Sequence, residues 1–266
     1  MGKVLAESYA DFNPIVWDRE ELDITNEEEL RAKLQEMKPD LVYNCAAYNL
    51  VDKAEEEVEQ ADTLNGYAVG NLARVCNDID AVLVHFSTNY VFDGENSEGY
   101  SEGDKPKPIS AYGRSKRLGE IELEQNTDKY YLIRTAWLYG GKGTGKRSFI
   151  DLMLELSKND KAIDAVTDEF GQPTFVHDLV QALVLLIQEQ KPFGTYHLTN
   201  SGIASWYDWA KEIFSIKNIA ARLSQVNSLD LKRMAKRPKY AVLNNTKFIE
   251  LRPWTEALRE YLNGKS

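Results

Sequence analysis

Short apolar runs alternate along this chain with longer stretches of helical periodicity. The apolar runs predict strands over residues 15–17, 41–45, 81–86 and 131–134. Alternation of this kind is typical of βαβ units, in which helices cover a parallel sheet. Nearly continuous apolarity also suits strands that are buried on both faces. The pattern therefore predicts an α/β fold with a parallel sheet.

The helix that follows the first strand has a readable start. Thr25 and Glu28 have the spacing of a capping box, in which a hydroxyl and a carboxylate satisfy free backbone N–H groups. This helix is expected to reach about Met37, because Pro39 follows. The other predicted elements are helices over residues 61–75, 112–124, 173–190 and 205–216 and a short strand over 196–198.

A glycine-rich, basic segment over residues 140–146 invites comparison with a phosphate-binding loop. Gly140 and Lys146 have the right spacing, but Arg147 stands where such a loop needs a hydroxyl residue to ligate magnesium. We therefore interpret the segment as a flexible loop rather than a nucleotide cradle.

The charge balance argues against partners that are polyanions. The 266 residues include 32 Lys and Arg and 42 Asp and Glu, a formal net charge of −10. Nucleic-acid binders usually carry a basic surface, and an acidic chain is also repelled by an anionic membrane. The one basic cluster consists of Lys232, Arg233, Lys236, Arg237 and Lys239.

Cysteine and histidine positions predict neither a disulfide nor a metal site. Cys45 and Cys76 have no zinc-type spacing and are expected to be buried free thiols of a reducing compartment. His85, His177 and His197 are scattered, and we interpret them as structural. No apolar run is long enough to span a membrane. The N-terminal residues turn acidic before any hydrophobic region develops, so we expect no signal peptide and a soluble, cytoplasmic protein.

Tyr112 and Lys116 form a Tyr-x-x-x-Lys pair, whose side chains share one face of a helix. An ammonium near a phenol favours the phenolate, so we expect the pKa of Tyr112 to fall toward the range useful for proton transfer. The same spacing recurs without a comparable context at Tyr207/Lys211 and Tyr261/Lys265. The apolar strand over 81–86 runs directly into the hydroxyl-rich residues 87–90 upstream of Tyr112. Open α/β sheets bind their ligands at such strand ends.

Several segments in a fixed order carry a resemblance to a known family. They are residues 21–25, 44–48, 51–55, 87–94, 112–116, 134–140 and 171–174. On these segments the chain resembles extended short-chain dehydrogenases/reductases and, within them, the dTDP-4-dehydrorhamnose reductase family. The resemblance covers nearly the whole chain. It implies a Rossmann-like, doubly wound, NAD(P)-binding domain over 1–140. Residues 141–266 would form a smaller α/β substrate-binding part, with some segments returning to the Rossmann core.

The resemblance also implies roles for individual residues. Tyr112 would protonate the 4-keto oxygen, Lys116 would bind the nicotinamide ribose and tune Tyr112, and Thr88 would hydrogen-bond the keto group. The residues implied at the cofactor are Gly2, Asp23, Ile24, Ala46, Ala47, Tyr48, Tyr112 and Lys116. Those implied at the sugar nucleotide are Thr88, Asn89, Tyr90 and Trp137. For Trp137 a core aromatic is an equally good interpretation.

Cofactor preference is open. Asp18 would bond the adenosine ribose hydroxyls and favour NADH, whereas Arg19 would pair with the phosphate of NADPH. Both residues would also serve as plain surface charge. The expected cofactor is therefore NADPH or NADH. Some members of the resembled family hold magnesium between subunits, but no carboxylate group in this sequence supports a metal site.

Two features depart from the family pattern. The family usually has Asp where this chain has Asn89, and an amide cannot carry the negative charge, so altered substrate affinity is expected. Family members also open with a strand and a glycine-rich loop that holds the cofactor pyrophosphate. Here Gly2 matches the last glycine of that loop, and residues 3–9 are expected to form the helix after it. Either an upstream segment precedes Met1, which we favour because Tyr112 and Lys116 are present, or the chain naturally abandoned the cofactor.

The leading hypothesis is NAD(P)H-dependent reduction of dTDP-4-dehydro-β-L-rhamnose to dTDP-β-L-rhamnose, by an oxidoreductase that forms a homodimer. The anionic sugar nucleotide would find positive charge at Lys116 and along residues 232–239. The alternative is a non-catalytic binding or regulatory subunit, similar to that of methionine adenosyltransferase. A sugar-nucleotide epimerase or dehydratase is a third reading. Dehydratases that resemble this group place an Asp-Glu pair after the strand-end threonine, and this chain has Asn89 and Tyr90 there.

Overall fold

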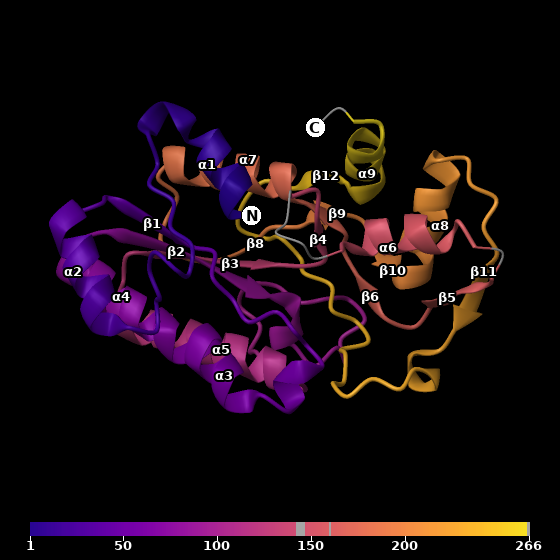
Figure 1. The fold of residues 1–266 in the computed structure, drawn as a ribbon, viewed down its shortest axis with the longest axis horizontal. Coiled ribbons are helices and arrows are strands. Elements are labelled where there is room, and N and C mark those ends of the chain that lie inside the picture. Colours follow the sequence, from indigo (N-terminus) through magenta and orange to yellow (C-terminus); the bar gives the residue numbers. More distant parts are fainter. Residues whose placement is uncertain (142–146, 160, 265–266) are drawn as a thin grey trace.

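The main sheet of the computed structural model, which describes residues 1–141, 147–159 and 161–264, consists of parallel strands. In the order β1-β2-β3-β8, these are β1 (Leu41–Asn44), β2 (Val82–Thr88), β3 (Tyr130–Thr135) and β8 (Gly194–His197). Figure 1 shows helices on both faces of this sheet. The predicted α/β fold and parallel sheet are confirmed.

The two faces of the sheet have separate cores because side chains alternate along each strand. Val84 points to the face covered by α1 (Gly2–Ser8) and α7 (Val176–Gln188). Leu83 points to the opposite face. The helices on that second face are α2 (Glu27–Met37), α3 (Val58–Asp62), α4 (Ala68–Asp78) and α5 (Ala111–Asn126) (Figure 1). The sheet is therefore doubly wound.

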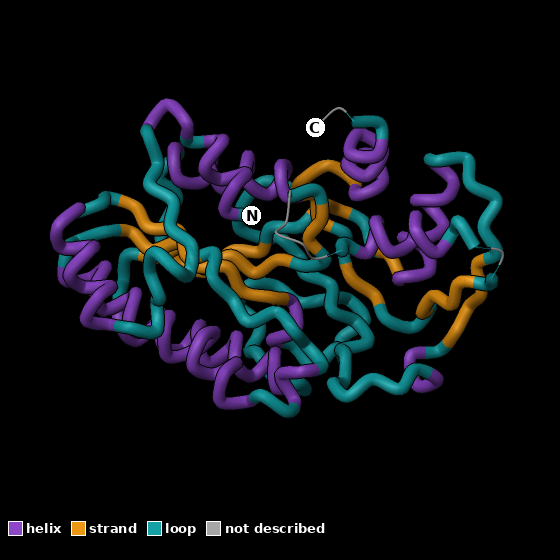
Figure 2. Tube along the Cα trace, viewed as in Figure 1, coloured by secondary structure: helices purple, strands orange, loops and turns teal. Residues whose placement is uncertain are grey.

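Beyond β3 the described chain builds small two-stranded sheets and further helices around another core, which is rich in aromatic side chains (Figure 2). The paired strands are β4 (Leu138–Tyr139) with β7 (Thr174–Phe175), β5 (Ile163–Val166) with β11 (Leu223–Val226), β6 (Phe170–Gly171) with β10 (Ala204–Ser205), and β9 (Asn200–Ser201) with β12 (Leu251–Pro253). The helices are α6 (Phe149–Leu156), α8 (Trp206–Ile216) and α9 (Trp254–Leu262). Strand β8 and helix α7 come from this half of the sequence. Strand β8 joins the main sheet, and α7 packs on one of its faces.

The predicted strand over residues 15–17 is wrong. These residues form no strand, and Ile15 and Val16 are 62% and 55% exposed. A strand needs a hydrogen-bonded neighbour, and among the described residues the outer edge of β1 carries none. An apolar run alone was therefore not enough to predict a strand here.

Helix α2 begins one residue later than the capping pattern predicts. The N-cap is Asn26, whose side chain accepts a hydrogen bond from the Glu29 N–H at 3.2 Å. The Thr25 hydroxyl instead donates to the Asp23 carboxylate at 2.7 Å. Because Asp23 captures the hydroxyl, Thr25 cannot act as the cap.

The predicted helix over residues 61–75 contains a π-helical turn, Thr63–Tyr67, between α3 and α4. Helix α5 approaches here so closely that a Cβ on Gly119 would lie 2.0 Å from the Asn65 carbonyl oxygen. The helix predicted over 173–190 begins only at Val176, since β7 precedes it. Residues 142–146 of the predicted glycine-rich loop lie outside the described part of the chain.

Cys76 is a buried free thiol as predicted, but Cys45 is exposed, because it follows β1 at the open edge of the sheet. Within residues 1–141, 147–159 and 161–264, no His, Cys, Asp and Glu side chains group as metal ligands would. In the same residues no helix combines the length and apolarity that crossing a bilayer requires.

Candidate active site

The carboxyl end of β2 meets the first turns of α5. The helix begins at Ala111 because the Ser110 side chain accepts a hydrogen bond from the Gly113 N–H at 3.1 Å. A Cβ on Gly113 would lie 2.3 Å from the Tyr90 carbonyl oxygen, so only glycine permits this approach. The contact brings Tyr112 against the strand-end residue Thr88.

The Tyr112 phenol lies close enough to the Thr88 hydroxyl for the two groups to interact. Burial raises the pKa of Tyr112 to about 12, and the interaction with Thr88 lowers it by a smaller amount. The direction is opposite to the one expected from a neighbouring lysine, because the Lys116 amine is turned to the Phe86 carbonyl. A tyrosine with this pKa is protonated at neutral pH and is suited to donating a proton.

Lys116 is 2% exposed, one helical turn after Tyr112. Its Nζ donates to the Phe86 carbonyl oxygen at 2.6 Å and lies 3.4 Å from His85 Nε2. Burial lowers the pKa of Lys116 to about 8, against the opposing charge of Glu120. A buried amine with this proton affinity, at a strand end, is a candidate functional group.

The residues after β1 reach the same place through a link that the sequence did not reveal. Asn65, in the π-helical turn, accepts a hydrogen bond from the Tyr48 N–H at 2.8 Å and donates to the Tyr48 carbonyl at 2.9 Å. It also donates to Ser115 of α5 at 2.9 Å. Tyr48 and Tyr112 pack against one small alanine cluster. No local signal marks Asn65, since its role depends on three segments meeting.

Asn89 and Tyr90 lie beside Tyr112 with different surroundings. Asn89 is 2% exposed, and its amide donates to the Ala241 carbonyl at 2.8 Å. A carboxylate could not make this bond, which gives a structural reason for Asn at this position. The Tyr90 ring lies edge-on to Tyr112, with centroids 6.0 Å apart. A substrate role for Asn89 and Tyr90 stays a prediction.

The basic stretch over residues 232–239 folds toward this end of the sheet. Arg237 forms an ion pair with Asp52 at 2.5 Å, and Arg233 forms one with Glu169. The charges of both arginines act on the Tyr90 phenol, whose pKa burial raises. Both arginines therefore lie near the strand end, each of them paired with a carboxylate.

Trp137 follows β3 at the same edge of the sheet, with an unusual backbone φ of +43°. Its ring stacks on Trp206 at 3.9 Å, and Gly171 leaves it room. The indole Nε1 is buried, and no hydrogen-bond partner for it lies in the described chain. Stacking favours packing and the unused donor favours a ligand contact, so both interpretations stand.

The residues near the N-terminus that were predicted to bind the cofactor make contacts mainly with their own sequence neighbours. Gly2 begins α1, and Ile24 packs against the core under α2. The Asp18 carboxylate accepts the Glu20 N–H at 2.8 Å, and the exposed Arg19 lies 3.6 Å from Asp23. The hydrogen bond from Thr25 and, more weakly, Arg19 hold the pKa of Asp23 below its usual range. Among the described residues no hydrogen bond or ion pair joins this segment to Tyr112, so its cofactor role stays a prediction. Ala46 and Ala47, after β1, present only small side chains there.

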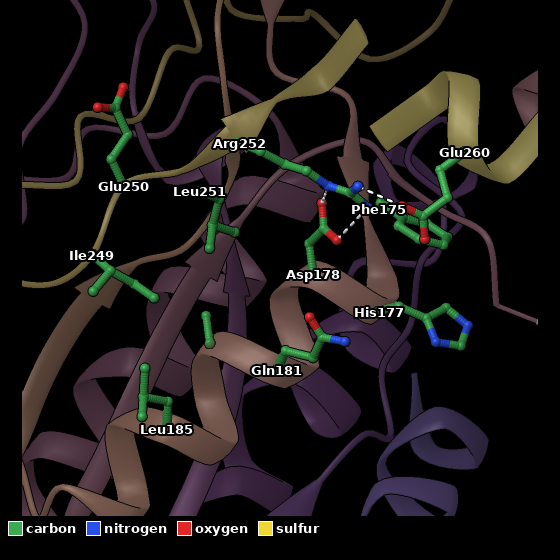
Figure 3. A pocket seen from close by; sticks show the side chains of 11 residues that line it. Phe175, His177, Asp178, Gln181, Leu185, Ile249, Glu250, Leu251, Arg252 and Glu260 are labelled. Atoms are coloured by element: carbon green, nitrogen blue, oxygen red, sulfur yellow. Dashed lines mark hydrogen bonds and ion pairs between the residues drawn. The ribbon is translucent and has the colours of Figure 1, made fainter. Parts of the chain in front are cut away.

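A pocket of about 660 Å³ lies elsewhere, between α7 and β12 (Figure 3). In this pocket the Arg252 guanidinium makes two hydrogen bonds of 2.8 Å to Asp178 and a third to Glu260. Because two carboxylates already bind the guanidinium, these bonds join β12 to α7 and α9, and the pocket is not an open anion site. Thr88, Tyr112 and Lys116 do not line it.

A model of the RmlD substrate binding domain matches residues 1–266. The chain belongs to the RmlD substrate binding domain family. Two relatives of this RmlD-family chain are the spore coat polysaccharide biosynthesis protein SpsK of Bacillus subtilis and a dTDP-4-dehydrorhamnose reductase of Mycolicibacterium smegmatis. SpsK is 35% identical over 97% of this chain and 90% of its own length. The reductase is 37% identical over 98% of this chain and 81% of its own length.

The fold of the RmlD-family chain is similar to that of a dTDP-4-dehydrorhamnose reductase from Bacillus anthracis solved in complex with NADP. That comparison has a TM-score of 0.94 at 36% identity and covers 98% of this chain and 94% of the other. A dTDP-4-dehydrorhamnose reductase ortholog from Clostridium acetobutylicum has a TM-score of 0.93 at 38% identity, with the same coverage. The predicted family and the Rossmann-like fold class are confirmed.

Proposed function

We propose that this RmlD-family chain is an oxidoreductase that reduces dTDP-4-dehydro-β-L-rhamnose to dTDP-β-L-rhamnose, with NADPH or NADH. The contact of Thr88 with Tyr112 beside the buried Lys116 is the observation that carries the proposal. The named relatives support the substrate, and the NADP complex of the Bacillus anthracis reductase supports the cofactor.

In this mechanism Thr88 and Tyr112 hold the 4-keto oxygen between two hydroxyl groups. Tyr112 donates its proton to that oxygen as the carbonyl is reduced, and Thr88 polarises the carbonyl. A bound nicotinamide supplies the hydride that carbon 4 receives. Lys116, which has N–H groups beyond the one on Phe86, holds the ribose.

The residues present fit the nicotinamide end of a dinucleotide. Ala46 and Ala47 leave space at the strand end, while Asn65 fixes the Tyr48 backbone between β1 and α5. Gly2 at the start of α1 would lie near the pyrophosphate, and Asp18 or Arg19 near the adenosine ribose. Choice between NADH and NADPH follows from which of those two side chains contacts the ribose.

The remaining parts of the proposal concern the whole protein. Residues 1–140 would bind the cofactor, and residues 141–266 would close over the sugar nucleotide. Asn89, Tyr90 and Trp137 of the first part and the basic stretch of the second would contact the sugar nucleotide. The ion pair between Arg237 and Asp52 supports this, since it ties the two halves together. We propose a cytoplasmic enzyme and a homodimer.

The test is NAD(P)H consumption by the purified chain with dTDP-4-dehydro-β-L-rhamnose. Tyr112→Phe removes the proton donor and is expected to lower kcat by about 10²–10⁴-fold. Tyr207→Phe is the matched control, because Tyr207 and Lys211 repeat the spacing on α8, and it should leave kcat unchanged. No consumption by the unaltered chain, or equal kcat in both variants, would overturn the proposal. Stoichiometric recovery of an enzyme partner without nicotinamide binding would instead support the regulatory alternative.

A further inference from the structure

A completely buried histidine lies next to Lys116, and the mechanism above does not use it. His85 is on β2 with no exposed surface, and its Nε2 lies 3.4 Å from Lys116 Nζ. A polar ring in this position needs hydrogen-bond partners on both nitrogens. Those partners determine where the ring carries its proton.

Asn44 determines the tautomer of His85. The two residues are directly opposite each other on β1 and β2. The Ala46 N–H donates to Asn44 Oδ1 at 3.1 Å, so the amide oxygen is fixed away from the ring. Asn44 Nδ2 then faces His85 Nδ1 at 3.1 Å. Because an amide nitrogen only donates, Nδ1 is the acceptor and the ring proton is on Nε2.

This tautomer directs an N–H group at Lys116. An ammonium has three donors and no acceptor, whereas a neutral amine has a lone pair that accepts the Nε2–H. The amine still donates one hydrogen to the Phe86 carbonyl oxygen at 2.6 Å. The surroundings of Nζ therefore favour the amine over the ammonium.

The other charged groups around Lys116 do not reverse this preference. Glu120, one turn along α5, raises the proton affinity of Lys116, but its carboxylate oxygens are bonded to Arg134, Arg117 and Ser87. Tyr112, one turn back, is neutral. His85 is neutral as well, because burial holds its pKa well below the usual range, and any charge on Lys116 lowers that pKa further.

We propose that His85, oriented by Asn44, is a positioning residue that lowers the proton affinity of Lys116 and so lets this lysine exchange a proton near neutral pH. The role rests on the proposed function. When Tyr112 has given its proton to the substrate oxygen, the phenolate regains one that the Lys116 ammonium releases through intervening hydroxyl groups or water, because Nζ itself is turned to the Phe86 carbonyl. Water then protonates the resulting amine. Each turnover thus consumes one solvent proton, which ends on the product hydroxyl.

The first test reads His85 and Lys116 directly by NMR of the full chain labelled on histidine nitrogens and lysine Cε, without substrate. We expect the ring proton on Nε2. His85→Phe keeps the volume but removes the donor, so the pKa of Lys116 should rise by about one unit, the value of one hydrogen bond. His197→Phe is the matched control, because His197 is equally buried on β8 but contacts Arg134 instead. It should leave the Lys116 titration unchanged.

The second test reverses the tautomer of His85. Asn44→Asp keeps the oxygen for the Ala46 N–H but presents a second acceptor to His85 Nδ1, which moves the ring proton to Nδ1 and makes Nε2 an acceptor. The pKa of Lys116 should then rise further than in His85→Phe. If His85→Phe does not fold, this variant carries the test. A ring proton on Nδ1 in the unaltered chain, or a Lys116 titration that neither variant moves, overturns the proposal.

Turnover provides a separate readout. In an active protein the pH dependence of kcat should move to higher pH together with the Lys116 titration in both variants. An inactive chain with the expected titrations contradicts the proposed reaction and leaves the His85 role supported. An active chain with unmoved titrations contradicts the His85 role alone.

Discussion

Two buried basic groups lie between the main sheet and α5, and they differ in whether a carboxylate pairs with them. One is Arg134 of β3 and the other is Lys116 of α5 itself. Arg134 on β3 is 2% exposed and makes two hydrogen bonds of 2.9 Å to the Glu120 carboxylate. Lys116 is equally buried, and within the described chain its hydrogen-bond partners are a carbonyl oxygen and a neutral ring. One charge is neutralised by a carboxylate, and the other is not.

The difference separates a structural charge from a functional one. Burial alone would favour a neutral Glu120, yet Arg134, Ser87 and Arg117 hold the pKa of this carboxyl below its usual range. The partners of Glu120 therefore stabilise its ionised carboxylate inside the protein. Lys116 has no such carboxylate partner in the described chain. Burial therefore destabilises its ammonium form and makes the proton easier to release.

The largest effect is expected for Arg134→Leu, which removes the ion pair of the structural charge. It removes both hydrogen bonds of Arg134 from the buried Glu120 carboxylate and leaves it with Arg117 and Ser87, which should lower the free energy of unfolding by about 3–5 kcal/mol. Urea unfolding of the variant measures the loss. The double variant Arg134→Leu/Glu120→Leu should recover a large part of it. A loss below about 1 kcal/mol would mean that water already screens the pair.

Lys116 should show the opposite behaviour through its pH dependence. The unfolded chain holds this proton up to about pH 10.5, whereas the folded chain loses it near pH 8. Between these values the unfolded state binds more protons, so stability should rise with pH by up to about 1.4 kcal/mol per pH unit. The gain should amount to about 3 kcal/mol across the window. It is measured as the difference from Lys116→Met, which lacks the titration, and a flat difference would contradict the lowered pKa.

A smaller loss of stability is expected when the buried neutral side chain of Asn89 is changed. Asn89→Asp replaces the donor to the Ala241 carbonyl by a carboxylate that can only accept, so two acceptors would face each other. The free energy of unfolding should fall by about 1–3 kcal/mol. Asn49→Asp, in the exposed loop after β1, is the control and should change little. Equal stability of the two variants would show that Asn89 is not held as the structure indicates.

The smallest effect should come from an exposed ion pair. Arg19 is 86% exposed on its side chain and lies 3.6 Å from Asp23. Water and salt screen such pairs, so Arg19→Ala should lower the free energy of unfolding by less than about 1 kcal/mol. The same urea titration checks this, and a loss close to that of Arg134→Leu would remove the distinction between buried and exposed charge.

Much of the fold could be predicted from local pattern. The strands at Leu41–Asn44, Val82–Thr88 and Tyr130–Thr135 follow from apolar runs, and α5 follows from helical periodicity. The failures have a common physical origin. Residues 15–17 are apolar but have no strand to pair with in the described chain, and Cys45 is exposed because β1 is at an edge. A pattern reports what a segment prefers, not which neighbour it obtains.

The sequence by itself determined the candidate chemistry, because Thr88, Tyr112 and Lys116 are brought together by one strand and the helix that follows it. Tertiary structure alone decided how those groups are tuned. Asn65 reaches Ser115 across 50 positions, Asn44 reaches His85 across 41, and His85 reaches Lys116 across 31. Helical spacing suggested that Lys116 would lower the pKa of Tyr112, whereas burial raises it. Spacing along one helix is a local property, but desolvation and partner choice depend on which distant segments surround a group in space.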